Sequence, residues 1–210
     1  VNERVAMAPA SRLFPLTLLA EQVAEDPDLL SSNVPLRDGL VSLVGPNFET
    51  VREGDIYAAK ELLAFALAGD LTAVDQLIGW LGRAEVEAFV GEIQGDDSPN
   101  FPFLTTGEFF KLKLLPEDDE LYRAYVDAEN EDERRSALVD LDWRRLPSAE
   151  DAAAIVRPTR VSEVEWRASA TELCDTLDRL AAAMDADATG TVRRAFNEIN
   201  ETNRQLGVWT

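Results

Sequence analysis

Histidine is missing from this 210-residue sequence, and cysteine occurs once, at Cys174. Histidine is the commonest general base and metal ligand in proteins, so its absence excludes Ser-His-Asp and Cys-His catalysis within the chain. One cysteine without histidine cannot supply the four ligands of an ordinary zinc site. A single cysteine also excludes an internal disulfide, and we therefore expect a reducing, cytoplasmic setting.

Long apolar runs and phosphate-binding glycine motifs are missing as well. No run approaches the roughly 20 apolar residues of a membrane span, and neither GxGxxG nor GxxxxGK occurs. Carboxylate pairs are so frequent that none stands out as a glycosidase or magnesium site. We expect no cofactor and no membrane partner.

Lysine is scarce and acidic residues are abundant. The chain has 40 Asp and Glu against 20 Lys and Arg, a net charge of −20, and 17 of the basic residues are arginines. This charge repels nucleic acid. Because the acidic residues occur in every part of the chain, we interpret the charge as adaptation to a high-salt cytoplasm, in a halophile or a virus of one. Mimicry of DNA is the alternative.

The first half of the chain reads as short helices. One is expected to begin near Ser11, and a second near an N-cap at Asp55, with apolar residues from Ile56 to Leu67 at helical spacing. Asp70 is the expected cap of a third helix over 71–81. A fourth helix is expected around 86–93, and glycines end the last three of these helices.

Residues 95–116 interrupt this pattern with an aromatic insert. It contains Phe101, Phe103, Phe109 and Phe110 together with turn-forming residues. The stretch 108–115 reads either as a short strand or as a helical turn. The phenylalanines either fill the core from a loop or form an exposed docking patch; we favour the core.

An acidic stretch follows, from 117 to 133. Its first four residues suit a helix N-terminus, where the helix dipole favours anions, and later arginines can pair with the acidic side chains. We interpret this stretch as a solvated helix face and not as a binding site.

The C-terminal third predicts an antiparallel helical hairpin over about 162–206. Ser162 and Glu165 form a capping box, with Val161 and Trp166 in the staple positions around it. A heptad-like apolar seam follows; its members are Trp166, Ala170, Leu173, Leu177, Leu180 and Met184. Cys174, next to the seam, is expected to be a small buried hydrophobe.

The turn of this hairpin resembles the start of a calcium loop, with oxygen ligands at Asp185, Asp187 and Thr189. Phe196 occupies the place of the bidentate glutamate that completes such loops. We therefore favour an acidic interhelical turn over a metal site.

Together these patterns predict a mainly α fold. Residues 1–147 form a helical-bundle-like body with the irregular insert at about 95–116. Residues 148–210 form the hairpin, packed on the body or on another subunit.

The scarcity of catalytic groups favours a non-enzymatic protein-interaction component adapted to high salt, with a protein partner or self-association. An adaptor, an assembly chaperone and a structural subunit such as a virion component fit equally. The alternatives are a carboxylate- or magnesium-dependent enzyme and an acidic DNA mimic. The candidate interaction residues are Phe101, Phe103, Phe109, Phe110, Trp166, Leu173, Leu177 and Leu180.

Overall fold

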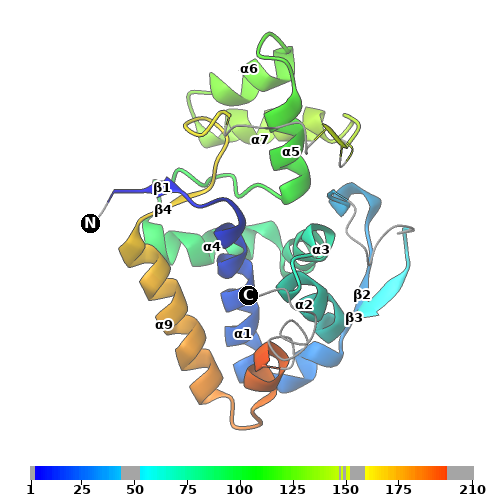
Figure 1. The fold of residues 1–210 in the computed structure, drawn as a ribbon, viewed down its shortest axis with the longest axis vertical. Helices are drawn as coiled ribbons and strands as arrows, with labels where there is room; N and C mark the ends of the chain where they lie inside the picture. The colour runs from blue at the N-terminus through cyan, green and yellow to red at the C-terminus, as the bar shows by residue number, and fades with distance from the viewer. Residues whose placement is uncertain (1–2, 44–52, 147, 149, 152–158, 198–210) are drawn as a thin grey trace.

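The structure is a computed structural model that describes residues 3–43, 53–146, 148, 150–151 and 159–197. It confirms a mainly α fold (Figure 1). The α-helices are α1 (Leu13–Glu25), α2 (Ala59–Leu67), α3 (Leu71–Leu81), α4 (Arg83–Gln94), α5 (Thr106–Leu114), α6 (Glu120–Val126), α7 (Glu131–Leu141) and α9 (Ala170–Ala186). The 3-10 helices are η1 (Ala8–Arg12), η2 (Pro27–Ser31) and η3 (Asp38–Leu40), and the strands are β1 (Val5–Ala6), β2 (Asn33–Pro35), β3 (Ile56–Ala58) and β4 (Arg167–Ala168).

Helix α1 is the centre of the core. It packs against α3, α4 and α9, so apolar residues cover most of its circumference. Phe14 has no exposed surface, and Leu19 and Val23 are each 1% exposed. Burial of each such side chain contributes about 1.5–3 kcal/mol. Pro15 lies in the first turn, where its missing N–H is tolerated, as predicted.

The expected helices 71–81 and 86–93 are confirmed as α3 and α4. Asp70 accepts a hydrogen bond from the Ala73 N–H at 3.0 Å and caps α3. Gly82 ends α3 with a φ of 95°, a conformation that L side chains rarely adopt, and α4 begins at the next residue.

The prediction that Asp55 caps a helix beginning at Ile56 is wrong. Residues 56–58 form β3, which pairs antiparallel with β2 and places Val34 opposite Tyr57. Helix α2 therefore begins at Ala59, and the Glu61 carboxylate accepts a hydrogen bond from the Ala58 N–H at 2.8 Å. Pairing with a distant strand overrides the helical spacing of this segment.

Helices α6 and α7 pack on each other and lie together at one end of the molecule, beyond α5 (Figure 1). Tyr122, Tyr125, Leu138 and Leu141 are buried in this end of the core. Asp119 caps α6 by accepting from the Leu121 N–H at 2.9 Å, as the acidic sequence before it predicts.

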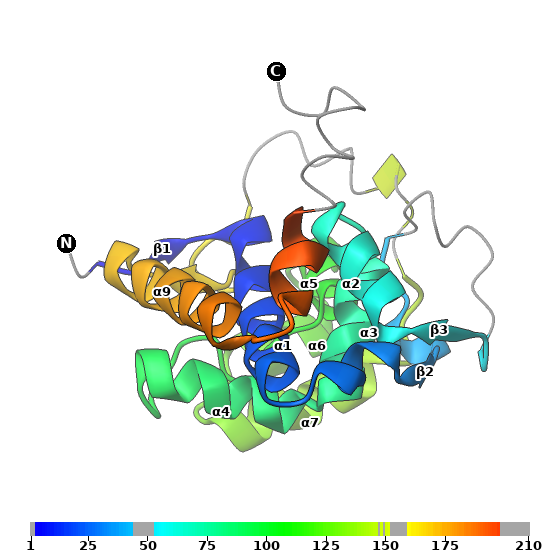
Figure 2. The same cartoon turned by 90° about the horizontal axis from the view of Figure 1, so that it is seen from below.

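The C-terminal segment packs on the body of the same chain. Figures 1 and 2 both show α9 lying beside α1. Strand β4 pairs antiparallel with β1, with Val5 opposite Ala168. A second helical stretch covers 191–197 after a turn, and the rest of the predicted second arm lies outside the described residues, so the antiparallel hairpin stays a prediction. The division at residue 147 stays a prediction.

The predicted start of the hairpin, with Ser162 as its cap, is wrong. Helix α9 begins at Ala170, and Ser169 is its N-cap, in a capping box with Glu172. Ser162 is exposed, and Trp166 lies in the chain that leads into β4. Cys174 is exposed and not buried as expected.

Candidate protein-interaction surface

Phe103 and Phe109 of the aromatic insert lie in the core together with Trp166. The rings of Phe109 and Trp166 stack, with centroids 4.5 Å apart, and Phe103 contacts both Trp166 and Phe14. Phe103 is 1%, Trp166 5% and Phe109 9% exposed. The favoured core interpretation therefore describes Phe103 and Phe109, and these two residues and Trp166 present little surface to a partner.

Phe101 and Phe110, the other two phenylalanines of the insert, are half-buried against this core. Phe110 packs edge-on against Phe109, with ring centroids 5.2 Å apart. It lines an apolar cavity of about 160 Å³, whose other apolar walls include Leu71, Val74 and Trp166. The second half of the insert contains helix α5, so 108–114 is helical and not a strand.

The predicted seam of α9 is used mainly inside the chain. Leu180 is buried, Leu173 is half-buried and packs on the core, and Leu177 is 47% exposed. The buried face of α9 also contains Thr176 and Ala183, which are not members of the predicted seam. The face that packs on α1 is therefore rotated relative to the predicted heptad positions. Only Leu177 of the seam offers substantial apolar surface.

A buried polar cluster on α3 fixes the position of α5. Asp75, fully buried, accepts hydrogen bonds from the backbone N–H groups of Thr106 at 2.7 Å and Gly107 at 2.9 Å. A residue of one helix thus caps the N-terminus of another. Burial raises the pKa of Asp75 to about 7, and the two N–H groups act against this rise.

The calcium-like turn is occupied by hydrogen bonds within the chain. Asp187 accepts from the N–H groups of Thr189 at 2.9 Å and Val192 at 2.6 Å. Asp185 pairs with Arg193 at 2.5 Å. Burial acts to raise the pKa of Asp187, but the hydrogen bonds from Thr189 and Val192 outweigh it and leave the pKa lowered. Within the described residues no three His, Cys, Asp or Glu gather as metal ligands.

One small cavity brings two acidic residues together with an arginine and a tyrosine. Glu163, Glu165, Arg134 and Tyr125 line it, but its volume is about 20 Å³. That volume suits a single water molecule and no substrate. Glu165 is also paired with Lys113 at 2.7 Å, and burial raises the pKa of Tyr125 to about 12. This cavity therefore gives no support to the alternative of a carboxylate-dependent enzyme.

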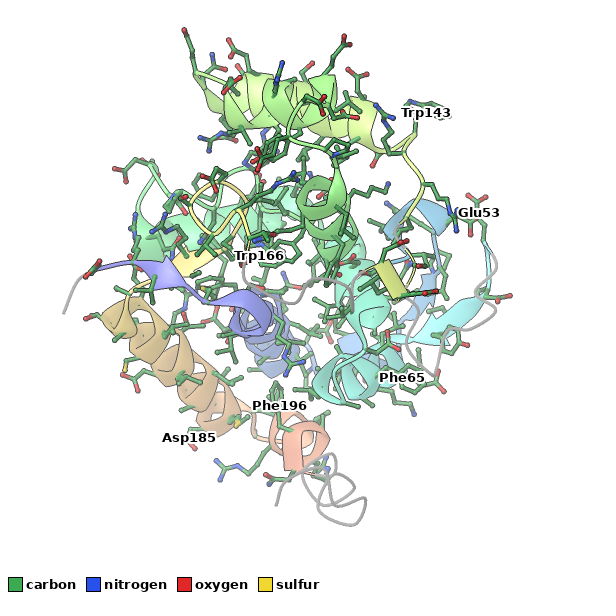
Figure 3. All side chains as sticks on the ribbon, turned by 45° about the horizontal axis from the view of Figure 1, so that its top comes forward. Glu53, Phe65, Trp143, Trp166, Asp185 and Phe196 are labelled. Carbon is green, nitrogen blue, oxygen red and sulfur yellow. The ribbon has the colours of Figure 1, made fainter. Side chains whose placement is uncertain are left out.

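The outer face of α7 carries the most exposed large apolar residue of the described chain. Trp143, just beyond the helix end, is 90% exposed, and Val139, four residues earlier, is 64% exposed. Residues spaced by four and three lie on one helix face, and two earlier positions, Asp132 and Ser136, extend the line. We call these four residues the α7 stripe. Figure 3 shows Trp143 at the outer end of α7 and Trp166 among the side chains of the interior.

The end of α7 that carries Trp143 is held from inside the molecule. The buried Lys111 ammonium donates to the backbone carbonyls of Leu141 at 3.4 Å and Asp142 at 3.3 Å. A cation at a helix C-terminus interacts favourably with the helix dipole. Burial lowers the pKa of Lys111 even though the charges of Asp142 and Glu108 act to raise it. The backbone next to the exposed Trp143 indole is therefore held by hydrogen bonds from a buried side chain.

Ion pairs lie around the α7 stripe, but two carboxylates on α7 take part in none of them. Arg135 pairs with Glu87 and Glu131, and Arg144 pairs with Asp119 at 3.2 Å. Asp132 and Asp140 are exposed and form neither an ion pair nor a hydrogen bond through their side chains with another described residue. Arg144 and Arg145 directly follow Trp143, so the acidic charge without a partner among these residues lies beside Val139, at Asp132 and Asp140.

Trp143 and Val139 were not among the residues predicted for an interaction site. The sequence does contain a signal: Ala137, Leu138 and Leu141 share one helical face, and Val139 and Trp143 fall on the opposite face. An amphipathic helix with apolar residues on its polar face exposes them. The predicted solvated face covers 117–133 and does not extend to Trp143.

No family model matches this sequence, and no curated protein matches it. In the described part of the chain, no helix combines the length and the apolar character needed to cross a bilayer.

Proposed function

We propose that this protein is a non-enzymatic interaction component, working in a high-salt solvent, that binds a partner protein through the α7 stripe. The observation that carries the proposal is Trp143, 90% exposed at the end of a well-anchored helix. Tryptophan is the residue most enriched among interface positions that dominate binding energy. A buried tryptophan removes about 200 Å² from water, worth about 5 kcal/mol before the costs of association.

The location of this surface differs from the one expected from the sequence. Phe103, Phe109 and Trp166 stabilise the core, and Leu180 packs inside the chain. The α7 stripe and its neighbour Asp140 remain available on the surface. An adaptor, an assembly chaperone and a structural subunit, including a virion component, all fit such a surface. The DNA-mimic alternative stays a prediction.

Affinity capture with a matched pair of variants tests the proposal. Wild-type protein, Trp143→Ala and the control Ile56→Ala would be immobilised at equal density and exposed to lysate of the native source in molar KCl. Ile56 is 62% exposed on β3, away from α7. We expect one stoichiometric partner to be retained by wild type and Ile56→Ala and lost by Trp143→Ala. Identical retention by all three, with a strict monomer in light scattering, contradicts the proposal.

A further inference from the structure

The charge around the α7 stripe selects among partners. Between residues 117 and 145 the sequence has eleven Asp and Glu, five Arg and no Lys. Two of these arginines, Arg135 and Arg144, form ion pairs with Glu131 and Asp119, while Asp132 and Asp140 have no partner among the described residues. A ligand that covers Trp143 and extends along the α7 stripe toward Asp132 must therefore approach unpaired carboxylates, although Arg144 and Arg145 follow Trp143.

We infer that the docking element of the partner is a basic amphipathic helix, in which an apolar stripe covers Trp143 and Val139 while flanking Lys or Arg side chains meet Asp132 and Asp140. The inference rests on the proposed function and adds the chemical class of the partner. Complementary charge guides encounter and excludes partners with carboxylates at the same positions.

The dimensions of the stripe fit such an element. From Asp132 to Trp143 the stripe covers eleven residue steps, about 16 Å at 1.5 Å per residue, or three helical turns. Helices that pack side by side bring apolar residues at i, i+3, i+4 and i+7 into contact. Trp143 lies at one end of this line with Val139 one turn before it, so a partner helix of about three turns covers both anchors.

Charge also argues against a second copy of this chain as the occupant. Two copies that meet through α7 bring together two molecules that each carry a net charge of −20. Like charges across an interface cost several kcal/mol unless salt screens them. Self-association through α7 is thus an outcome that the experiment must detect separately.

The two parts of the interaction respond differently to salt. The Debye length is about 8 Å at physiological ionic strength and about 3 Å near 1 M, so the contribution of Asp132 and Asp140 falls in molar KCl. Burial of the Trp143 ring does not depend on charge and is strengthened by salts that favour burial. We expect the carboxylates to contribute selectivity mainly at low salt and the indole to maintain affinity at both low and high salt.

Three labelled synthetic helices of about 14 residues test the inference. The first has leucine on one face and lysine on the other, the second replaces lysine by glutamate, and the third replaces leucine by serine. Fluorescence anisotropy with the full chain would be measured at about 0.15 M and about 2 M KCl. We expect the leucine–lysine helix to bind at least about tenfold more tightly than either other helix at the lower salt, a difference of about 1.4 kcal/mol.

Substitutions then separate the anchor from the charge. Trp143→Ala should weaken binding of the leucine–lysine helix about tenfold at both salt concentrations. The double variant Asp132→Lys/Asp140→Lys should weaken it about tenfold at the lower salt and about twofold at the higher. The matched controls Ile56→Ala and Asp178→Lys, exposed on β3 and α9, should leave binding unchanged.

Three results overturn the inference. Equal binding of the glutamate helix, binding that is indifferent to Asp132→Lys/Asp140→Lys, or a dimer in sedimentation that Trp143→Ala abolishes each excludes a basic partner helix. The first and third results leave the proposed function intact if binding still requires Trp143. If Trp143→Ala changes neither peptide binding nor the partner retained from lysate, the proposed function fails as well.

Discussion

Asp75 is the residue whose chemistry differs most from its ordinary behaviour. Its buried carboxyl group caps α5, and α5 carries Phe109 into the aromatic core. The pKa of Asp75 is about 7 in the folded protein and 3.8 as the ordinary value that applies to the unfolded chain. Between these two values the folded protein keeps the proton that the unfolded chain has released. Stabilisation by the protonated group is fully present below the unfolded pKa and is lost as pH rises through about 7.

We predict that Asp75→Ala destabilises the protein by about 2 kcal/mol near pH 5, because it leaves the N–H groups of Thr106 and Gly107 without their buried acceptor. The difference in unfolding free energy between Asp75→Ala and wild type should shrink near pH 8, because wild type has then lost the stabilisation that protonated Asp75 gives. Guanidinium unfolding of both proteins at the two pH values measures this. Asp178→Ala, on the exposed side of α9, is the control. An Asp75→Ala effect that is the same at both pH values contradicts the prediction.

Among the helices, the start of α9 shows how local sequence and tertiary structure compete. The chain offers two capping boxes seven residues apart, Ser162 with Glu165 and Ser169 with Glu172. The second is used because Trp166 stacks on Phe109 and residues 167–168 pair with β1. Both interactions require the residues between the two boxes to be extended, and they involve partners far away in the sequence.

We predict that Ser169→Ala lowers the free energy of unfolding by about 1 kcal/mol, since it removes the acceptor of the Glu172 N–H at 3.2 Å. Ser162→Ala should change it by less than about 0.5 kcal/mol, as expected for an exposed side chain outside the helix. Urea unfolding of the two variants beside wild type distinguishes the two possible helix starts. A larger effect at Ser162 would restore the start predicted from the sequence.

The helices that could be predicted are those whose signals are local. Asp70 and Gly82 delimit α3 through contacts within a few residues, so the sequence is sufficient. Strand β3 could not be predicted, because its conformation depends on β2, more than 20 residues earlier. The phase of the α9 seam was also misjudged: a heptad places Leu177 inward, whereas the contact with α1 buries Thr176 and Leu180.

The candidate interaction residues are large and apolar, and the sequence shows this property. The sequence could not show which of these side chains are buried in the core. Phe103 and Trp166 come together from segments more than 60 residues apart. Trp143 follows the acidic stretch 117–133, and its exposure follows only when Leu138 and Leu141 are known to face α5 and α6.

At the scale of the whole molecule, the placement of lysine sharpens the interpretation of the charge. Two of the three lysines, Lys111 and Lys113, are each 7% exposed, so Lys60 is the one lysine on the surface. Short carboxylates expose less hydrocarbon than lysine stems do. A surface rich in acids and nearly free of lysine supports the proposal of a high-salt solvent.

We predict that the melting temperature rises steadily as KCl increases from about 0.1 M to about 3 M, because shorter screening lengths relieve repulsion among the 40 carboxylates. Differential scanning calorimetry at constant pH measures this. Repeating the series near pH 4 is the control and should give a weaker dependence, because about half of the carboxylates are then protonated and the net charge approaches zero. A flat response at neutral pH contradicts adaptation to salt.

The packing of α9 on α1 sets a condition on how the chain is made. A ribosome that adds about 5–20 residues per second needs about 10–30 s to pass from the end of α1 at Glu25 to the end of α9 at Ala186. During that interval the nascent chain carries Phe14, Leu19 and Val23 without the helix that covers part of α1 in the finished molecule. Protection of newly synthesised α1, by a chaperone or by transient contacts with α3 and α4, is therefore a requirement of this topology.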